Sequence, residues 1–288
     1  MHVKRQGLDV IINQVDYLKK VLERFQMTNA KPTQTLLPSN WDLKENKGKA
    51  MAAEVTCYQS IIGSLLYLMQ SIGTHPDISY AVTHLSQFST NPSEDHYKAA
   101  MHICCYLAGT QDYLLVYNKS TDKGLMAYTD SDWAADKIRR RSITGYFFKL
   151  ADGIVSWCSH AQKTVALSST EAEYMAISDC SRQVVWIKTM IEELEIKLKA
   201  ISIYGDNQGS IFIASNPVQE SRTKHIDIWY HYIHEVVSAK KVELMFMPGE
   251  MNPADMFTKN LGKIKFIKFQ NYLGLDFEDS DESPVNSL

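Results

Sequence analysis

The sequence predicts an α/β protein in which helices cover a mixed sheet and a small helical region precedes it. Two observations lead to this prediction. Up to about residue 115, apolar residues recur mainly at helical spacing, whereas short runs of alternating polarity follow that point. Later in the chain, helical and strand patterns alternate, which is typical of proteins whose sheet has helices on its faces.

The first region is expected to be a helical unit without evident chemistry of its own. Apolar residues at helical spacing predict helices at residues 9–27 and near residues 56–71, 76–90 and 94–108. The polar segment 28–55 indicates a loop. Pro76 stands near a predicted helix start, where a proline is tolerated.

The second region carries the strands and the longest helix. Strands are predicted at 125–131, 144–150, 153–158, 200–205 and 240–247, and helices at 169–195, from Asn207, at about 222–238 and near Pro253. The pair Asp152-Gly153 indicates a turn between two of the strands. Residues 276–288 are rich in acids and end in Pro and Ser residues, a composition typical of a disordered tail.

Length and composition limit the class of protein. The chain has 288 residues, 45% of them hydrophobic, which is enough for one large domain or two ordinary ones with a real core. Because the formal net charge is -3, a nucleic-acid partner would need a local basic patch. The five cysteines lack CxxC pairing, which favours reduced thiols in an intracellular compartment. Neither a signal peptide nor a membrane-spanning apolar run is expected.

Four carboxylates are the candidate chemistry of the second region. They are Asp130 in YTDSDW, Glu173 in STEAEY, Asp206 in YGDNQ and Asp255 in NPAD. Carboxylates that converge from separate elements can hold two divalent cations, and two such cations can drive in-line cleavage of a phosphodiester. The four acids therefore predict a nuclease.

Glu173 is the most informative of the four. On the predicted helix its line runs through an apolar stripe of Ala176, Ile177, Cys180, Val184, Ile187 and Ile191. Glu171 lies on a more polar line and should face solvent. An ionised carboxylate on an apolar stripe is costly unless it is paired or binds a metal. The structural alternative is that Glu173 only stabilises the helix N-terminus, where the macrodipole favours a negative charge.

Each of the other three acids has a structural alternative. Asp130 and Asp132 follow the same strand at the same parity, so alternation cannot choose between them, and either could form a turn. Asp206 stands between a strand and a helix, where an aspartate is often an N-cap. Asp255 occupies a similar position after Pro253. The nuclease hypothesis therefore depends on all four acids meeting at one sheet edge.

Histidines and basic residues give weaker signals. His231 and His234 could share a helix face and bind a metal, together with His225, but no completing ligand stands at zinc spacing, which favours a helix facing solvent or substrate. The basic cluster either contacts phosphates or forms a solvated loop; its members are Lys137, Arg139, Arg140 and Arg141, with Lys163 near in sequence.

Long ordered motifs resemble the ribonuclease H domain of copia-type LTR retrotransposons. They are YTDSDWAAD, RRRSITGYFF, IVSWCS, ALSSTEAEYMA, IYGDNQGSI, TKHIDIWYHYI and NPADMFTK. The preceding motifs YQSIIGSLLYL, GTHPDISYAV, LSQFSTNPSEDHY and YLAGTQDYLLVY resemble the segment that joins reverse transcriptase to ribonuclease H, and residues 9–27 resemble a helix of the thumb. The resemblance covers about residues 5–275.

This resemblance implies a domain plan and an activity. Residues 1–115 would be a helical remnant of the reverse-transcriptase thumb and connection, residues 116–275 a ribonuclease H-like domain with a mixed five-stranded sheet, and residues 276–288 a disordered acidic tail. The implied reaction is hydrolysis of the RNA strand of an RNA–DNA hybrid. The polymerase portion of the same polyprotein is an implied partner. No Tyr-x-Asp-Asp motif occurs, so DNA synthesis by this chain is not expected.

The resemblance also implies a set of site residues. The catalytic and metal-binding acids would be Asp130, Glu173, Asp206 and Asp255, with two Mg²⁺ or Mn²⁺ ions as cofactors. Substrate contacts are expected from Gln208 and Ser210 near the site, and from Arg139, Arg140 and Arg141. An intracellular location is expected, in a cytoplasmic particle or in the nucleus.

Two departures from the family pattern leave alternatives open. His75 replaces the usual arginine before Pro76, and the segment CYLAGT replaces a more basic RYLKGT, so two positive charges are absent from the connecting region. A catalytically inactive remnant that acts as a hybrid-binding or structural module is one alternative. An integrase or transposase of the same superfamily is another, although those enzymes carry the glutamate last in the order.

Overall fold

A five-stranded mixed sheet forms the centre of the protein in the computed structural model, which describes residues 1–38, 43–70, 74–118, 124–196, 198, 200–216 and 227–277. The strand order is β6-β5-β4-β7-β8. Its strands are β4 (Met126–Asp132), β5 (Ile143–Leu150), β6 (Gly153–Ala161), β7 (Ile201–Gly205) and β8 (Val242–Phe246). β4, β5 and β6 pair antiparallel, whereas β4 with β7 and β7 with β8 pair parallel.

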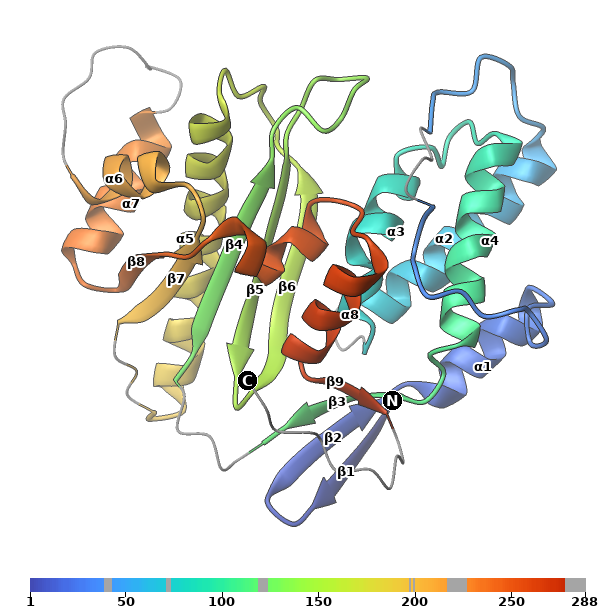
Figure 1. The fold of residues 1–288 in the computed structure, drawn as a ribbon, viewed down its shortest axis with the longest axis horizontal. Coiled ribbons are helices and arrows are strands. Elements are labelled where there is room, and N and C mark those ends of the chain that lie inside the picture. Colours follow the sequence, from blue (N-terminus) through green and yellow to red (C-terminus); the bar gives the residue numbers. More distant parts are fainter. Residues whose placement is uncertain are drawn as a thin grey trace.

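Helices flank this sheet as the sequence predicts. The long helix α5 (Ser169–Glu193) packs against β4 and β5, and the helices α6 (Gln208–Ser215) and α7 (Asp227–Ser238) lie beside α5 and β8 (Figure 1). The stripe of α5 that contains Cys180, Val184 and Ile187 is buried in the core formed with β4, β7 and β8. The predicted α/β class with a mixed five-stranded sheet is therefore confirmed.

The first region contains the expected helices and a sheet that the sequence did not predict. Its helices are α1 (Val15–Arg24), α2 (Ala52–Met69), α3 (Ser79–Ser86) and α4 (Glu94–Ala108), with the 3-10 turn η1 (Pro76–Ile78) before α3. Its strands are β1 (His2–Gln6), β2 (Asp9–Asn13) and β3 (Tyr113–Tyr117). The helix predicted over 9–27 is wrong for residues 9–13, because they form a hairpin with β1 around Gly7, whose φ is +62°.

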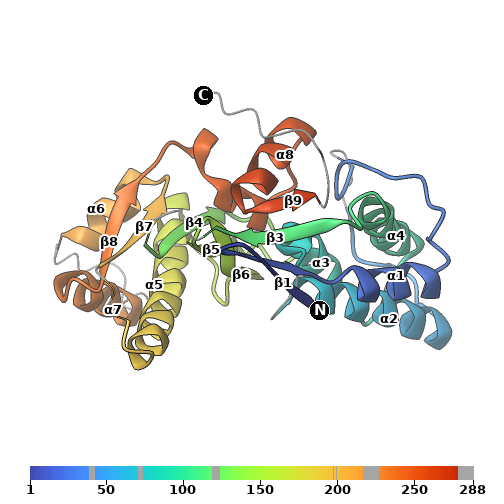
Figure 2. The ribbon, with the colours of Figure 1, turned by 90° about the horizontal axis from the view of Figure 1, so that it is seen from below.

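The C-terminal segment returns to this first region. After the 3-10 turns η2 (Gly249–Met251) and η3 (Pro253–Phe257), helix α8 (Lys263–Tyr272) leads to β9 (Leu275–Phe277), which pairs with β3 (Figure 2). One apolar core includes residues of α2, α3 and α4 together with Phe147, Ile154 and Phe269. The predicted boundary between residues 115 and 116 falls within β3. The apolar core includes residues from both sides of this boundary.

Two further expectations concern the tail and the thiols. Residues 276 and 277 belong to β9 rather than to a tail, and residues 278–288 lie outside the described part. All five cysteines are free in the structure, and the intracellular compartment expected from them stays a prediction. Within the described residues, no helix has the length and apolar character needed to cross a membrane.

Candidate active site

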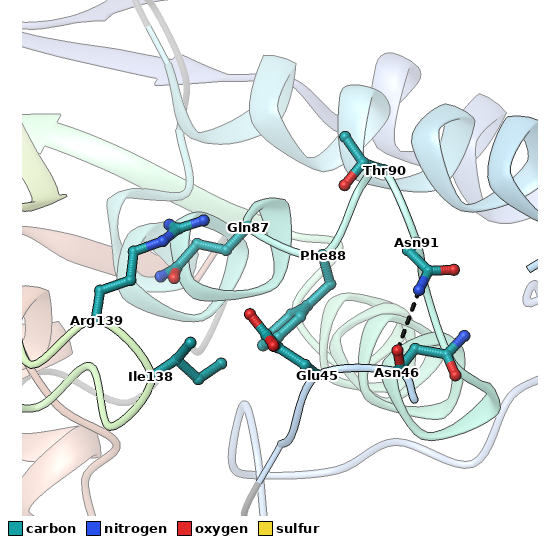
Figure 3. Close-up of a pocket in the computed structure, with 8 residues that line it drawn as sticks. All are labelled: Glu45, Asn46, Gln87, Phe88, Thr90, Asn91, Ile138 and Arg139. Carbon is teal, nitrogen blue, oxygen red and sulfur yellow. Dashed lines mark hydrogen bonds between the residues drawn. The ribbon is translucent and has the colours of Figure 1, made fainter. Parts of the chain in front are cut away.

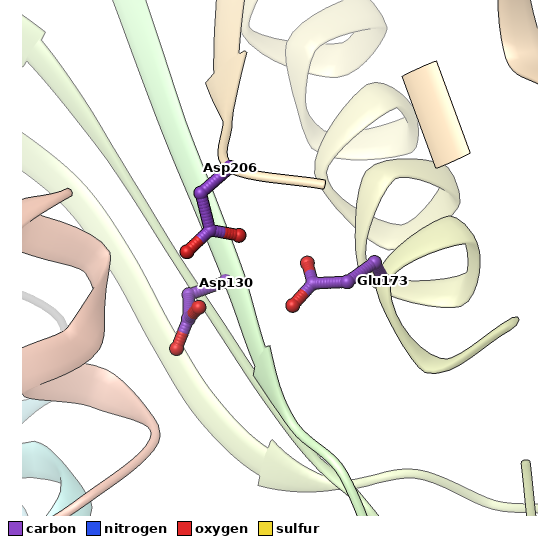
Figure 4. A group of neighbouring side chains, drawn as sticks. All are labelled: Asp130, Glu173 and Asp206. Atoms are coloured by element: carbon purple, nitrogen blue, oxygen red, sulfur yellow. The ribbon is translucent and has the colours of Figure 1, made fainter. Parts of the chain in front are cut away.

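Three of the four predicted acids meet at one edge of the five-stranded sheet. Asp130 lies on β4, Glu173 on α5 and Asp206 directly after β7, and their carboxylate groups point toward one another (Figure 4). One oxygen from each of the three residues lies within 4.8 Å of the others. Three acids that are far apart in the sequence, on three separate elements, therefore meet at one point in the fold.

The parallel pairing of β4 with β7 explains why the two aspartates meet. Tyr128 and Tyr204 are partners in the register, so Asp130 and Asp206 each stand two residues further along their strands. The carboxyl ends of parallel strands share one edge of a sheet, which is where ligands usually bind in α/β proteins. Asp130 is 2% exposed, whereas Asp206 is half-buried. Alternation along β4 alone could not select Asp130 over Asp132; the pairing with β7 does.

Helical spacing correctly distinguished the two glutamates of α5. Glu173 is 6% exposed, and its Oε1 accepts a hydrogen bond from the backbone N–H of Ser131 at 3.1 Å. Glu171 instead accepts a hydrogen bond from the backbone N–H of Leu167 at 2.8 Å, outside the helix N-terminus. Ser168 caps the helix by accepting from the backbone N–H of Glu171 at 3.1 Å. Glu171 thus interacts with the backbone at the helix N-terminus, whereas Glu173 faces the other acids.

Gln162 fixes α5 to the sheet beside the acids. Its Nε2 donates to Ala172 O at 2.8 Å and to Thr144 Oγ1 at 3.0 Å, and it lies 3.3 Å from Ser131 Oγ. These partners belong to α5, β5 and β4, so a single buried amide joins the three elements. Such a bond network limits the positions that Glu173 can take relative to β4.

Burial and mutual repulsion make the three acids difficult to ionise. Burial, to which Asp255 and Asp206 add, raises the pKa of Asp130 to about 7, against the opposing effects of Lys259 and Thr258. Burial also raises the pKa of Glu173 well above its ordinary value, and the charges of Asp130 and Asp206 add to this. The pKa of Asp206 is raised by burial and by Asp255. A cation held by these oxygens would relieve both costs.

Asp255 lies next to the cluster but has cationic partners of its own. It is 2% exposed in η3, and its Oδ1 lies 2.6 Å from Lys259 Nζ. Its Oδ2 accepts a hydrogen bond from Lys265 Nζ. The carboxylates of Asp130 and Asp255 raise the pKa of Lys259 against the effect of burial, which lowers it. Asp255 thus has two cationic partners, and one of them, Lys259, also lies 3.6 Å from Asp130 Oδ2.

Two hydrogen bonds hold the Asp255 segment against β4. Asn252 Nδ2 donates to Thr129 O at 2.9 Å, and the hydroxyl of Thr258 donates to Asp130 Oδ2. Gly145 is the register partner of Asp130 and leaves space for this segment. A Cβ at position 145 would lie 2.7 Å from Cβ of Phe257 and from Cγ2 of Thr258. The close approach of η3 to the acids thus depends on a glycine in β5.

The residues predicted to contact substrate near the acids differ in accessibility. Gln208 is exposed at the first turn of α6. Ser210 is 1% exposed, and its hydroxyl donates to Asn207 O at 2.8 Å. The backbone N–H of Ser210 donates to Asn207 Oδ1, also at 2.8 Å, so Asn207 is the N-cap of α6. Gln208 is therefore free to reach outward, whereas Ser210 completes a cap.

The basic loop between β4 and β5 faces the first region. Arg139 and Ile138 line a hollow of about 210 Å³ together with Glu45, Asn46, Gln87, Phe88, Thr90 and Asn91 (Figure 3). Arg139 and Arg140 are exposed and Arg141 is half-buried. The loop is held by Asp136, whose Oδ1 accepts from the backbone N–H of Arg139 at 3.0 Å. Its basic side chains are thus presented from a structured turn.

The histidines do not join a metal-binding group in the described part of the chain. His231 is exposed and His234 is half-buried, and neither belongs to a cluster of potential ligands. His225 lies outside the described residues. The solvent-facing or substrate-facing helix expected for His231 and His234 is compatible with their positions on α7.

Several residues of this site were missed in the sequence. Lys259 follows Asp255 by four residues, a spacing that allows an ion pair on a helical turn and could have been noticed. Lys265 and Gln162 carried no usable signal, because their partners are set by the tertiary fold. Gly249 also carried no usable signal, because its contact with Asp206 is set by the tertiary fold. A Cβ at position 249 would lie 2.7 Å from Asp206 Oδ2.

The comparisons with known proteins concern nearly the whole chain. It is 39% identical over 278 residues to a retrovirus-related Pol polyprotein from transposon TNT 1-94 of Nicotiana tabacum, covering 94% of this chain and 21% of that polyprotein. It is 37% identical over 276 residues to the corresponding polyprotein from transposon RE1 of Arabidopsis thaliana, covering 96% of this chain and 19% of the relative. The chain thus spans about a fifth of the length of these curated relatives.

Structural similarity is weaker. A crystal structure of RNase H1 from Halobacterium salinarum superposes with a TM-score of 0.34 at 14% sequence identity, over 47% of this chain and 95% of that one. A score this low supports no conclusion about activity. No protein-family model matches the chain.

Proposed function

We propose that this chain, which belongs to the retrovirus-related Pol polyproteins of transposons, is a ribonuclease H that hydrolyses the RNA strand of RNA–DNA hybrids. The observation that carries the proposal is the convergence of Asp130, Glu173 and Asp206, three buried or half-buried acids from three elements, at one sheet edge. A purely structural role would not require three carboxylates to face one another, because their mutual repulsion is unfavourable.

The donor set fits a hard divalent cation. All three side chains offer carboxylate oxygens, which Mg²⁺ and Mn²⁺ prefer to sulfur or imidazole ligands. We propose that Asp130, Glu173 and Asp206 hold the first cation and that Asp255 contributes to a second. When bound, divalent cations at such a site lower the pKa of a water molecule and stabilise negative charge on the leaving oxygen.

The protein itself supplies orientation and exclusion of water. The N–H of Ser131 fixes one oxygen of Glu173, and the hydroxyl of Thr258 fixes one oxygen of Asp130. Asp130 and Glu173 are almost fully buried, whereas Asp206 is half-buried, so Asp206 is the most accessible of the three acids. A phosphodiester would therefore be held at the open edge of the sheet.

Substrate contacts follow from the same geometry. Gln208 is exposed two residues after Asp206 and is suited to hydrogen-bond a 2′-hydroxyl, the group by which RNA differs from DNA. Arg139 and Arg140 are exposed on the loop after β4 and are suited to contact phosphates, with Arg141 beside them. The polymerase portion of a polyprotein is the proposed partner that would deliver the hybrid.

The proposal is tested with purified protein and four labelled substrates: RNA–DNA hybrid, single-stranded RNA, duplex RNA and duplex DNA. We expect Mg²⁺-dependent cleavage confined to the RNA strand of the hybrid and abolished by EDTA. A folded, monodisperse sample that cuts nothing, but still binds the hybrid, would support instead an inactive hybrid-binding module. Cleavage of duplex DNA would point to the integrase or transposase class.

A further inference from the structure

One lysine lies between two of the four acids. Lys259 Nζ is 2.6 Å from Asp255 Oδ1 and 3.6 Å from Asp130 Oδ2. Both carboxylates are 2% exposed, whereas the lysine side chain is 39% exposed. Its aliphatic part thus remains near the surface while its charged end reaches the buried acids. A cation shared by Asp130 and Asp255 would have to take the place of this ammonium group.

The local charges match one divalent cation better than two. The four acids carry four negative charges when ionised, and Lys259 and Lys265 supply two positive charges through their contacts with Asp255. Two negative charges remain, which a single divalent cation neutralises. A second divalent cation would leave an excess of two positive charges in the buried site, and displacement of Lys259 reduces that excess to one; excess charge in a buried site is costly. Asp132, which is half-buried, lies outside the cluster of three acids.

We infer that Lys259 occupies the position of a second cation and makes cation loading of this site stepwise. The first divalent cation binds to Asp130, Glu173 and Asp206, each of which offers one oxygen within 4.8 Å of the others. The second binds only when it displaces Lys259 from Asp130 and Asp255. This inference rests on the proposed function for the location of the first cation, and it assigns Lys259 the role of a positioning residue.

The surrounding contacts explain why Lys259 is held in this place. It stands four residues after Asp255, and its backbone N–H donates to Asp255 O at 3.1 Å. The preceding residue, Thr258, donates its hydroxyl to Asp130 and is fully buried. The backbone of this turn is therefore fixed to both acids, and only the lysine side chain needs to swing outward when a second cation arrives.

Cation binding can be measured without reference to catalysis. Metal-free protein is titrated with Mn²⁺ alone, and free Mn²⁺ is followed by electron paramagnetic resonance. For the wild-type protein we expect one stronger and one weaker site, with dissociation constants that differ by on the order of tenfold or more. In Lys259→Gln the second site should become stronger by on the order of tenfold, while the first changes little. Lys259→Arg retains the charge and should retain the stepwise binding.

A nearby exposed lysine supplies the matched control. Lys263→Gln removes one positive charge from the same segment without a contact to Asp130 or Asp255, and it should leave both sites unchanged. Two sites of equal affinity in the wild-type protein would overturn the inference, as would a second site that is unchanged in folded Lys259→Gln. Absence of Mn²⁺ binding in every variant would overturn the proposed metal site as well. Stepwise binding without hybrid cleavage would overturn only the proposed function.

Discussion

Two buried aspartates in different regions of the molecule have opposite surroundings. Asp77, in η1 of the first region, is fully buried, and its Oδ2 accepts hydrogen bonds from Tyr106 Oη and, at 2.9 Å, from Gln270 Nε2. Asp130, on β4, is 2% exposed and has two other carboxylates within reach of its own. Both residues are equally hidden, so burial alone does not separate a structural acid from a functional one.

The difference lies in the neighbours. The hydrogen-bond partners of Asp77 are neutral donors from α4 and α8, which join the first region to the C-terminal helix, and His75 Nδ1 lies 3.6 Å from Asp77 Oδ1. The neighbours of Asp130 include Glu173 and Asp206, and burial, together with the charges of Asp255 and Asp206, raises the pKa of Asp130. A carboxylate surrounded by donors stabilises the fold, whereas carboxylates that face one another store an unfavourable charge that a cation can relieve.

The largest effect on stability should come from Asp77→Ala. The substitution leaves Tyr106 and Gln270 without their buried acceptor, and it should lower the free energy of unfolding by about 3 kcal/mol. Urea unfolding followed by circular dichroism measures this loss. Asp112→Ala, on an exposed turn, is the matched control and should change stability by less than about 0.5 kcal/mol. Equal stability of the two variants would mean that the Asp77 network contributes nothing.

The stability of the metal-free protein should fall as the pH rises. Burial raises the pKa of Asp130 to about 7 in the folded state, whereas the unfolded chain ionises near the ordinary value of 3.8. Between these values the unfolded state binds fewer protons than the folded state, so stabilisation present below about pH 4 is lost as the pH rises toward 7. Glu173, whose pKa is also raised by burial, acts in the same direction.

This pH dependence is measured by denaturant unfolding in EDTA at several values from pH 4 to pH 8. Asp130→Asn removes the titrating group, so its stability should decline less than that of the wild-type protein. Mg²⁺ should restore stability to the wild-type protein at pH 8 and have less effect on the variant. Parallel curves for both proteins would contradict the predicted cause.

A smaller effect is expected from glycine substitutions, with opposite signs in the two regions. A Cβ at Gly145 would lie 2.7 Å from Cβ of Phe257, so Gly145→Ala should push η3 from β4 and cost about 1–3 kcal/mol. Gly63 is exposed in α2 and has nothing within 4 Å of an added Cβ. Gly63→Ala should therefore raise stability by about 0.5–1 kcal/mol. Thermal unfolding measures both changes. Unchanged or higher stability of Gly145→Ala would contradict the packing described for Gly145, and a loss in Gly63→Ala would contradict the expectation for an open helical position.

The same contrast shows how far sequence reasoning reached. Glu173 could be preferred to Glu171 because a helix of 25 residues has a regular face, and the buried stripe defines that face. Strand alternation could not choose between Asp130 and Asp132, since both have the same parity. That choice required the pairing of β4 with β7, a tertiary contact that no local pattern contains.

The errors have a similar physical origin. Residues 9–13 show helical spacing but become a strand, because β1 and β3 pair with them from either side. Gln270 and β9 return to the first region through tertiary contacts that no local pattern near residue 115 contains. The ion pairs of Asp255 depend on flexible lysine side chains, whose partners are fixed only once η3 packs on β4.

The central claim is that the cluster of Asp130, Glu173 and Asp206 carries a metal-dependent nuclease activity. The most direct test compares RNA-strand cleavage of a hybrid by Glu173→Gln and by Glu171→Gln, two variants of one helix that differ by two positions. We predict that cleavage falls by on the order of 10²–10³-fold in Glu173→Gln, since an essential electrostatic group is lost, and persists in Glu171→Gln. Full cleavage by Glu173→Gln, with an unchanged unfolding curve, would contradict the account.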